Sequence, residues 1–335
     1  MILNQRIAID LGTANTIIYV VGRGIIANEP TVVALSEEEN KVIAVGNEAK
    51  RMLGRTPGNL LALRPMRDGV IADYQVTEAM LRYFIGLASP KFSFLKPEVM
   101  ICVPAGCTQV ERRAVLDASL SAGARAAYLI DEPLAAAIGA KIPISASTGH
   151  MIVDIGGGSS EAAVICLGGV VVHKSVRVGG NKVDEAIANF LRRRYNLIIG
   201  DQTAEEIKIK IGSAIPLPQD EIMEVSGRDQ VLGLPRTITL NSHAVTEAIR
   251  PTLLQIIGAM KGVLEDTPPE LASDIIERGI TMSGGTSCLR NFDRLVVQET
   301  GVPAHLAEDP LLCVVKGTGI ALENLDLYKR SITRR

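Results

Sequence analysis

Apolar runs and glycine-containing turns alternate along this chain, and the runs follow two periodicities. Compact apolar runs at 7–9, 17–21, 99–103, 128–130 and 151–153 predict buried strands. Apolar residues that recur every three to four positions over 77–88 predict a helix, and Thr108 followed by Glu111 predicts a capped helix over 109–122. Strands that alternate with helices in this way indicate an α/β fold built on a central sheet.

The segment 7–16, IAIDLGTANT, joins two of these strands by a polar turn. Gly12 allows a ligand to approach the backbone closely, and successive N–H groups in such a turn form a concavity that binds anions. Asp10, at the strand end, is a residue type that holds a hydrated Mg²⁺. The turn is therefore half of a candidate site for a metal-bound phosphate, and a plain β-hairpin with a glycine turn is the alternative interpretation.

The same pattern returns at 151–161, MIVDIGGGSSE, with Asp154 standing 144 positions after Asp10. A pair of such turns at the length of a domain predicts two similar domains that face each other across a cleft. We expect the first domain over 1–145, with an insertion at about 36–65, and the second over 146–335, with an insertion at about 181–241. Each domain would contribute one glycine turn and one carboxylate.

Several later elements complete the second half. Helices are predicted over 184–195, 204–211, 244–264 (capped by Ser242) and 309–325. The turn SGGTS at 283–287 stands between a strand and a helix predicted over 289–300, which suits an anion or a purine ribose. The basic end of the chain, 329–335, is expected to fray.

Composition narrows the class of protein. The chain has 335 residues, 47% of them hydrophobic and 21% charged, which predicts a globular protein with sizeable cores. A net charge of −2 gives no general attraction to nucleic acid. Five scattered cysteines without a CxxC pair argue for free thiols in a reducing compartment, and residues 1–6 show no signal peptide.

These motifs together resemble the superfamily of actin, DnaK-type chaperones and sugar kinases, and within it the MreB family of bacterial actin homologues over essentially the whole chain. The resemblance is carried by the stretches at 7–16, 28–35, 64–74, 111–118, 131–140, 154–161 and 267–280. It implies a two-domain actin-like ATPase fold, each half a mixed, ribonuclease H-like sheet flanked by helices and carrying a small inserted subdomain.

The resemblance also implies a function. We expect an ATP-binding cytoskeletal protein that forms double antiparallel filaments on the inner face of the cell membrane and works with membrane proteins of cell-wall elongation to maintain rod shape. Its location would be cytoplasmic and peripheral on that membrane, its cofactors ATP and Mg²⁺, and its reaction a slow hydrolysis of ATP to ADP and phosphate.

Site residues carry over by position. The resemblance assigns the first phosphate turn to Gly12, Thr13, Ala14 and Asn15, and the second to Gly156, Gly157 and Gly158. It assigns the nucleoside to Glu205, Glu206, Ile207 and Lys208 on one wall and Gly284, Gly285, Thr286 and Ser287 on the other. Asp10 and Asp154 would hold Mg²⁺ through water.

Glu132, helped by Ser159, would orient the attacking water. The alternative for Glu132 is a helix N-terminal acid that complements the dipole beside Pro133.

The sequence departs from the family pattern in three places: Ser159-Ser160 replace two threonines, Thr286 stands where glycine is usual, and Asn181 replaces an acid. Serine keeps the hydroxyl but loses the methyl that restricts its rotamers, so slower hydrolysis is expected. Thr286 introduces a side chain where the nucleotide would lie. ATP binding is expected to survive these changes.

Residues 91–96, KFSFLK, hold two of the five phenylalanines in a polar setting. Phe92, Phe94 and Leu95 between lysines suit the interface of headgroups and acyl chains, and family members insert an apolar loop at this place. Packing of these side chains under the first domain is the alternative. For the whole chain, a small-molecule kinase or other non-filament ATPase of the same superfamily is the alternative function.

Overall fold

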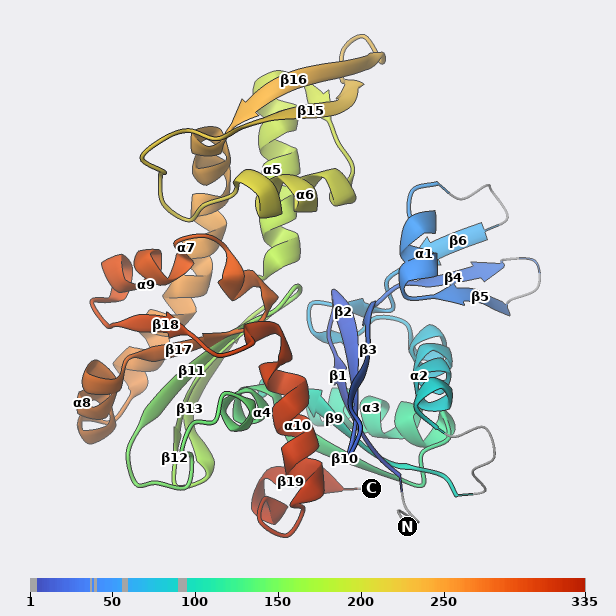
Figure 1. The fold of residues 1–335 in the computed structure, drawn as a ribbon, viewed down its shortest axis with the longest axis vertical. Helices are drawn as coiled ribbons and strands as arrows, with labels where there is room; N and C mark the ends of the chain where they lie inside the picture. The colour runs from blue at the N-terminus through green and yellow to red at the C-terminus, as the bar shows by residue number, and fades with distance from the viewer. Residues whose placement is uncertain (1–4, 37, 39–40, 56–59, 90–94, 335) are drawn as a thin grey trace.

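The computed structural model describes residues 5–36, 38, 41–55, 60–89 and 95–334, and it places two sheets side by side with a smaller sheet above each (Figure 1). The first sheet has the order β19-β10-β9-β1-β2-β3. Its strands are β1 (Arg6–Leu11), β2 (Asn15–Val20), β3 (Gly24–Pro30), β9 (Glu98–Val103), β10 (Ala126–Asp131) and β19 (Ile332–Arg334).

The second sheet has the order β13-β12-β11-β17-β18. Its strands are β11 (His150–Ile155), β12 (Ser160–Cys166), β13 (Gly169–Val176), β17 (Ile280–Ser283) and β18 (Ala304–Leu306). In each sheet three strands consecutive in sequence pair antiparallel, a later strand pairs in parallel with the first of them, and a further strand pairs in parallel with that later strand. The two halves therefore repeat one topology, as the recurring turn predicts.

Helices cover the outer faces of both sheets. They are α2 (Tyr74–Ala88) and α3 (Gln109–Ser121) on the first, and α7 (Ser242–Asp266), α8 (Pro269–Arg278) and α9 (Phe292–Thr300) on the second. The predicted capping box of Thr108 and Glu111 is present at the start of α3. No helix in the described part of the chain is both long and apolar enough to cross a bilayer.

Two helices, α4 (Glu132–Gly139) and α10 (Cys313–Glu323), lie between the sheets (Figure 1). They cross at glycines: a Cβ atom on Gly139 would overlap the backbone of Cys313, and one on Gly317 would overlap the carbonyl of Ala135. The crossing is buried in a core cluster to which strands of both sheets contribute. The two halves are thus joined by backbone-to-backbone packing of one helix from each.

A small sheet stands above each half. Above the first are β4 (Val33–Ser36), β5 (Lys41–Val45), β6 (Leu60–Leu63) and α1 (Asn47–Met52), followed by the two-residue strands β7 (Met66–Arg67) and β8 (Val70–Ile71). Above the second are α5 (Gly180–Tyr195), β14 (Leu197–Ile198), α6 (Asp201–Ile211), β15 (Ile222–Asp229) and β16 (Pro235–Asn241).

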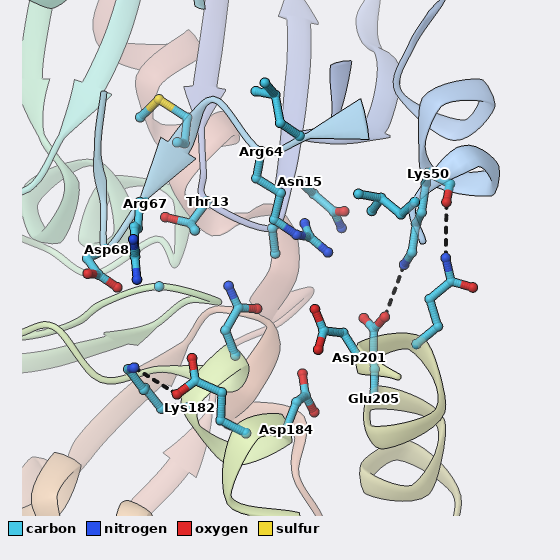
Figure 2. A pocket seen from close by; sticks show the side chains of 18 of the residues that line it. Thr13, Asn15, Lys50, Arg64, Arg67, Asp68, Lys182, Asp184, Asp201 and Glu205 are labelled. Carbon is cyan, nitrogen blue, oxygen red and sulfur yellow. Dashed lines mark hydrogen bonds and ion pairs between the residues drawn. The ribbon is translucent and has the colours of Figure 1, made fainter. Parts of the chain in front are cut away.

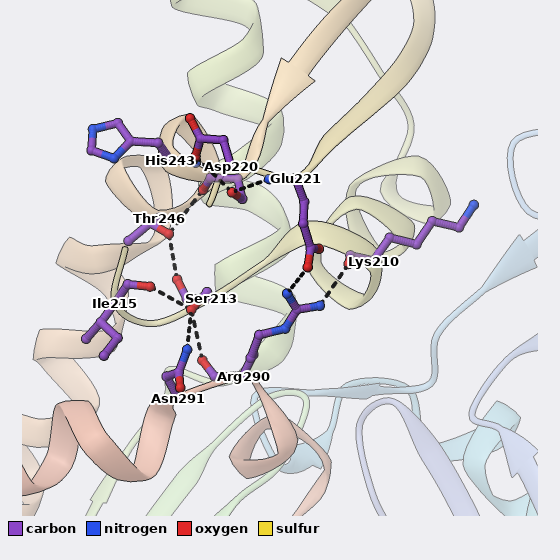
Figure 3. A network of polar contacts seen from close by, with 10 residues as sticks. Lys210, Ser213, Ile215, Asp220, Glu221, His243, Thr246, Arg290 and Asn291 are labelled. Carbon is purple, nitrogen blue, oxygen red and sulfur yellow. Dashed lines mark hydrogen bonds and ion pairs between the residues drawn. The ribbon is translucent and has the colours of Figure 1, made fainter. Parts of the chain in front are cut away.

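A polar network fastens the second small sheet to the half below it (Figure 3). Asn291 donates from its amide to Ser213 at 3.0 Å, and the hydroxyl of Thr246 donates to the Ser213 carbonyl at 2.9 Å. Arg290 joins the same region through the Glu221 carboxylate and the Lys210 carbonyl. Arg290 and Asn291 lie three and four positions after the 283–287 turn, so these contacts link the segment behind that turn to the end of α6 and the residues that follow it.

Several predicted boundaries are wrong. α5 begins at Gly180, not 184, because the N–H groups of Gly180 and Asn181 are satisfied by carbonyls of the second glycine turn. Asn241, not Ser242, caps α7 by accepting from the Ala244 N–H at 2.9 Å.

The remaining differences lie near the end of the chain. Within the predicted helix 289–300, α9 begins only at Phe292, after a left-handed Asn291 (φ 59°), and the short helix η1 (Gly285–Cys288) precedes the predicted range. The predicted helix 309–325 is divided into η2 (Pro310–Leu312), which follows a left-handed Asp309, and α10, and the break lies at Leu312. Instead of fraying, the end forms η3 (Lys329–Ser331) and β19, which pairs with β10 of the first sheet.

Candidate functional site

The two glycine turns face each other across one cavity. A Cβ atom on Gly157 would lie 2.6 Å from the Cβ of Ala14, and one on Gly158 would collide with the side chain of Thr13. Both turns line a cavity of about 270 Å³ that also receives Asp10, Glu132, Asp154 and Ser159. Only glycine at positions 157 and 158 allows the second turn to approach the first this closely.

Each turn is stabilised by hydrogen bonds to neighbouring segments of the chain. The hydroxyl of Thr31 donates to the Gly12 carbonyl at 2.6 Å, and the Gly69 N–H donates to the Thr13 hydroxyl at 2.9 Å. In the second turn the Gly156 carbonyl accepts the Gly180 N–H at 3.0 Å, at the first residue of α5. The turns are therefore pre-organised, and the backbone N–H groups that do not serve these contacts can bind an anion.

Three carboxylates lie beneath the turns without a basic partner. In the described part of the chain no Lys or Arg forms an ion pair with Asp10, Glu132 or Asp154. Burial and the charge of Asp154 raise the pKa of Asp10 to about 7, and burial raises that of Asp154 to about 6 against a lowering hydrogen bond from Ser283. Burial followed by the charge of Glu161 raises the pKa of Glu132 well above its ordinary value.

This cluster fits a hydrated cation. Buried carboxylates without a counter-charge are costly, and a divalent ion supplies the missing positive charge. Within the described ranges no three acidic, histidine or cysteine side chains are arranged to ligate an ion directly. Carboxylates that line a cavity beside the glycine turns are the ligand type of Mg²⁺, which keeps most of its waters and is completed by substrate phosphates.

Glu161 is a fourth buried acid that the motif did not identify. It is 2% exposed, and burial raises its pKa to about 7. It stands directly opposite Asp154 in the register of β11 and β12, so both side chains lie on one face of the sheet. An acid within the otherwise apolar run of β12 was the available signal.

The turn at 283–287 forms a further wall of the cavity. Its Gly284 has a φ of 85° and lies against the backbone of Ile155. The Thr286 side chain is 7% exposed, and its hydroxyl donates to the Gly156 carbonyl at 2.8 Å. The hydroxyl of Ser287 is turned back to the Gly284 carbonyl at 2.6 Å, and Ser287 does not line either cavity described here.

Of the four residues assigned to the nucleoside on α6, two line the cavity and two do not. Glu205 and Lys208 line the cavity, and Lys208 forms an ion pair with Asp184 at 2.9 Å. Glu206 instead pairs with Lys210 at 2.7 Å on the exposed side of the helix, and Ile207 is buried in the core of the second half. Neither Glu206 nor Ile207 lines the two cavities, because adjacent residues of a helix point to different sides.

A larger cavity of about 520 Å³ opens above the turns between the two small sheets (Figure 2). It shares Thr13, Ala14, Asn15, Gly158, Asn181 and Glu205 with the first cavity. Lys50 from α1 reaches across it to Glu205 at 3.0 Å, and Gln202 donates to the Lys50 carbonyl at 3.0 Å. Sequence patterns gave no signal for Lys50, Arg64 and Arg67, which line this cavity from the first half.

Most of the predicted membrane-contacting segment, 91–96, lies outside the residues that the structure describes. Phe92 and Phe94 lie outside the described residues, and Leu95 is 48% exposed.

Comparisons with known proteins agree with this geometry. The family model described as "MreB/Mbl protein" matches residues 4–330. The chain is 54% identical to the cell shape-determining protein MreB of Escherichia coli (strain K12) over 330 residues, covering 97% of this chain and 95% of that protein. It is 50% identical to the cell shape-determining protein Mbl of Bacillus subtilis (strain 168), covering 98% and 99% respectively.

Among solved structures, MreB5 of Spiroplasma citri bound to AMPPNP superposes with a TM-score of 0.92 at 35% identity, covering 98% of both chains. The repeated sheets with facing glycine turns define an actin-like fold. Within that class, this chain belongs to the MreB/Mbl family of cell shape-determining proteins.

Proposed function

We propose that this protein binds ATP with Mg²⁺, polymerises into double antiparallel filaments, and hydrolyses ATP slowly as it does so. The observation that carries the proposal is the pair of facing glycine turns above buried carboxylates that have no basic partner. It is supported by relatives named as cell shape-determining proteins and by the AMPPNP complex of MreB5.

We assign the phosphates to the two turns, 12–15 and 156–158, and Mg²⁺ to Asp10 and Asp154 through water. The ion supplies neutralisation of the charge that develops on the transferred phosphoryl group. Glu132, the first residue of α4, orients a water for in-line attack and is assisted by the Ser159 hydroxyl. Because the pKa of Glu132 is raised, its carboxylate has a higher affinity for the proton that the attacking water gives up.

The nucleoside is assigned to the cavity between α6 and the 283–287 turn, against Glu205, Lys208, Gly284, Gly285 and Thr286. Residues 1–145 and 146–335 are proposed as the two closing domains, with insertions at about 36–65 and 181–241. The return of β19 to the first sheet ties the end of the second domain to the first.

We propose that the filaments lie in the cytoplasm, peripheral on the inner face of the membrane. There we propose contact with the lipid surface through Phe92, Phe94 and Leu95, and with membrane proteins of cell-wall elongation. No nucleic acid partner is proposed, since the net charge of −2 provides no electrostatic attraction.

Two measurements test the proposal. Titration with ATP in the presence of Mg²⁺ should show saturable binding, and addition of ATP to the protein should raise light scattering and sediment it. Binding without saturation would contradict the site, and a monomer that consumes ATP only with an added metabolite would favour a kinase. Phe94→Ser with Leu95→Ser should abolish sedimentation with liposomes and leave ATP binding intact; unchanged sedimentation would contradict the membrane contact.

A further inference from the structure

Glu161 is a buried acid that the proposed chemistry does not use. It belongs to a polar row that runs in register across four neighbouring strands of the second sheet: Ser283, Asp154, Glu161 and Ser175. Residues in register lie on the same face, so Glu161 is directed to the same side as the proposed metal-binding Asp154. Its burial to 2% exposure makes an idle carboxylate costly.

One oxygen of Glu161 contacts the other half of the molecule. Its Oε2 accepts a hydrogen bond from the backbone N–H of Ala105 at 2.8 Å. Ala105 lies in the 104–107 segment, which joins β9 of the first sheet to α3. A Cβ atom on Gly106 of this segment would lie 3.4 Å from the Cβ of Ser175, so the segment rests directly on the second sheet.

The same segment reaches the candidate catalytic groups. A Cβ atom on Gly69 would lie 3.2 Å from Pro104 and 2.9 Å from the Ser159 hydroxyl, so these three residues meet at the edge of the phosphate cavity. The second oxygen of Glu161, Oε1, is buried and makes no hydrogen bond within the described structure. Burial raises the pKa of Glu132 most, and the charge of Glu161 is the next largest cause.

We infer that Glu161 is a positioning residue for ATP hydrolysis, which anchors the 104–107 segment of the first half to the second sheet and so fixes Pro104 beside Gly69 and Ser159 at the phosphate cavity. The inference rests on the proposed function. Glu161 touches neither the nucleotide nor the attacking water in this scheme; it acts through the contact between the halves.

Three variants separate these roles. Glu161→Gln keeps an oxygen for the Ala105 N–H but removes the charge, and Glu161→Ala removes both. Arg177→Gln is the matched control. The Arg177–Glu111 ion pair (3.7 Å) also joins α3 to the second half, but it is exposed and does not involve the buried acids.

The measurements are steady-state ATP hydrolysis and hydrogen exchange of the 104–107 segment. In Glu161→Gln kcat and the exchange rate of the Ala105 amide should stay within about twofold of the wild type, because the amide oxygen of glutamine still accepts the Ala105 N–H. In Glu161→Ala kcat should fall about tenfold with KM within about twofold of the wild type, and the Ala105 amide should exchange faster. Arg177→Gln should leave all three readouts unchanged.

An unchanged kcat in Glu161→Ala, or an equal loss of kcat in Glu161→Gln, would overturn the inference, and so would an equal loss in Arg177→Gln. Should Glu161→Ala fail to fold, Glu161→Met, which fills the space without an oxygen that could accept from Ala105, takes its place with the same expected results. A wild type that binds but does not hydrolyse ATP would contradict the proposed function instead. Hydrogen exchange at Ala105 would then decide the anchoring, with unaltered exchange in both Glu161 variants overturning it.

Discussion

The Nζ of Lys50 on α1 lies 3.0 Å from a carboxylate oxygen of Glu205 on α6, and this ion pair joins the two small sheets across the upper cavity (Figure 2). Glu205 is also a residue assigned to the nucleoside. The same carboxylate would therefore serve both the closure of the cavity and the proposed ligand, and nucleotide exchange would be coupled to the position of the small sheets.

Lys50→Met should accelerate nucleotide release by about twofold to fivefold, because a half-exposed ion pair contributes at most about 1 kcal/mol. Stopped-flow release of a fluorescent ADP analogue measures the rate. Lys210→Met is the control: Lys210 pairs with Glu206 on the same helix at 2.7 Å but does not reach the other half. Equal acceleration in both variants would show that the cross-cavity pair does not matter.

Gly157→Ala should weaken ATP binding by about tenfold or more, because its new methyl group would meet Ala14, at 2.6 Å, and push the two turns apart. Equilibrium titration of ATP measures the loss. Gly169→Ala, at a site with open space around it, should bind ATP as the wild type does. Wild-type affinity in Gly157→Ala would mean that ATP does not require the turns to be this close.

Thr286→Val should weaken ATP binding by about threefold to tenfold, because it removes a hydrogen bond of 2.8 Å between the nucleoside wall and the Gly156 carbonyl, worth about 1 kcal/mol. Thr286→Ser retains the hydroxyl and should bind as the wild type does. Tighter binding by Thr286→Val would instead indicate that the side chain crowds the nucleotide.

Without nucleotide, stability should fall as the pH rises from about 4 to about 7. The folded pKa values of Asp10 and Asp154, about 7 and about 6, exceed their ordinary value of 3.8, so the folded state binds more protons than the unfolded state in this window. Urea unfolding at several pH values measures the slope, which Asp154→Asn should reduce. The opposite trend, an Asn variant with a steeper decline, would contradict the buried cluster.

Sequence patterns were sufficient for the two strand–turn–strand units. Their signals are local: an apolar run, an acid at its end and a glycine two residues later, found at Asp10 and again at Asp154. Local signals also located the capping box of α3. The matching topology of the two sheets follows from the repetition of these units.

Other parts of the site depend on tertiary contacts that no local pattern encodes. Glu161 is recognised only when the register of β11 and β12 places it opposite Asp154. Lys50 and Glu205 are 155 positions apart and meet because the two halves fold over one another. Conversely, the assignment of consecutive residues on α6 placed Glu206 and Ile207 in the site, although the helical rotation of about 100° per residue directs them to solvent and core.

The crossing of α4 and α10 has a consequence for the distance between the phosphate-binding turns. Gly139 and Gly317 set the distance between the two helices at that crossing. Each carries only a hydrogen atom where any other residue would place a Cβ atom against the backbone of the facing helix. A single methyl group there would wedge the two sheets apart at their base, and the gap would widen toward Ala14 and Gly157. The spacing of the two turns, and with it the proposed affinity for a triphosphate, would thus be set at a helix crossing that lies outside the nucleotide cavity.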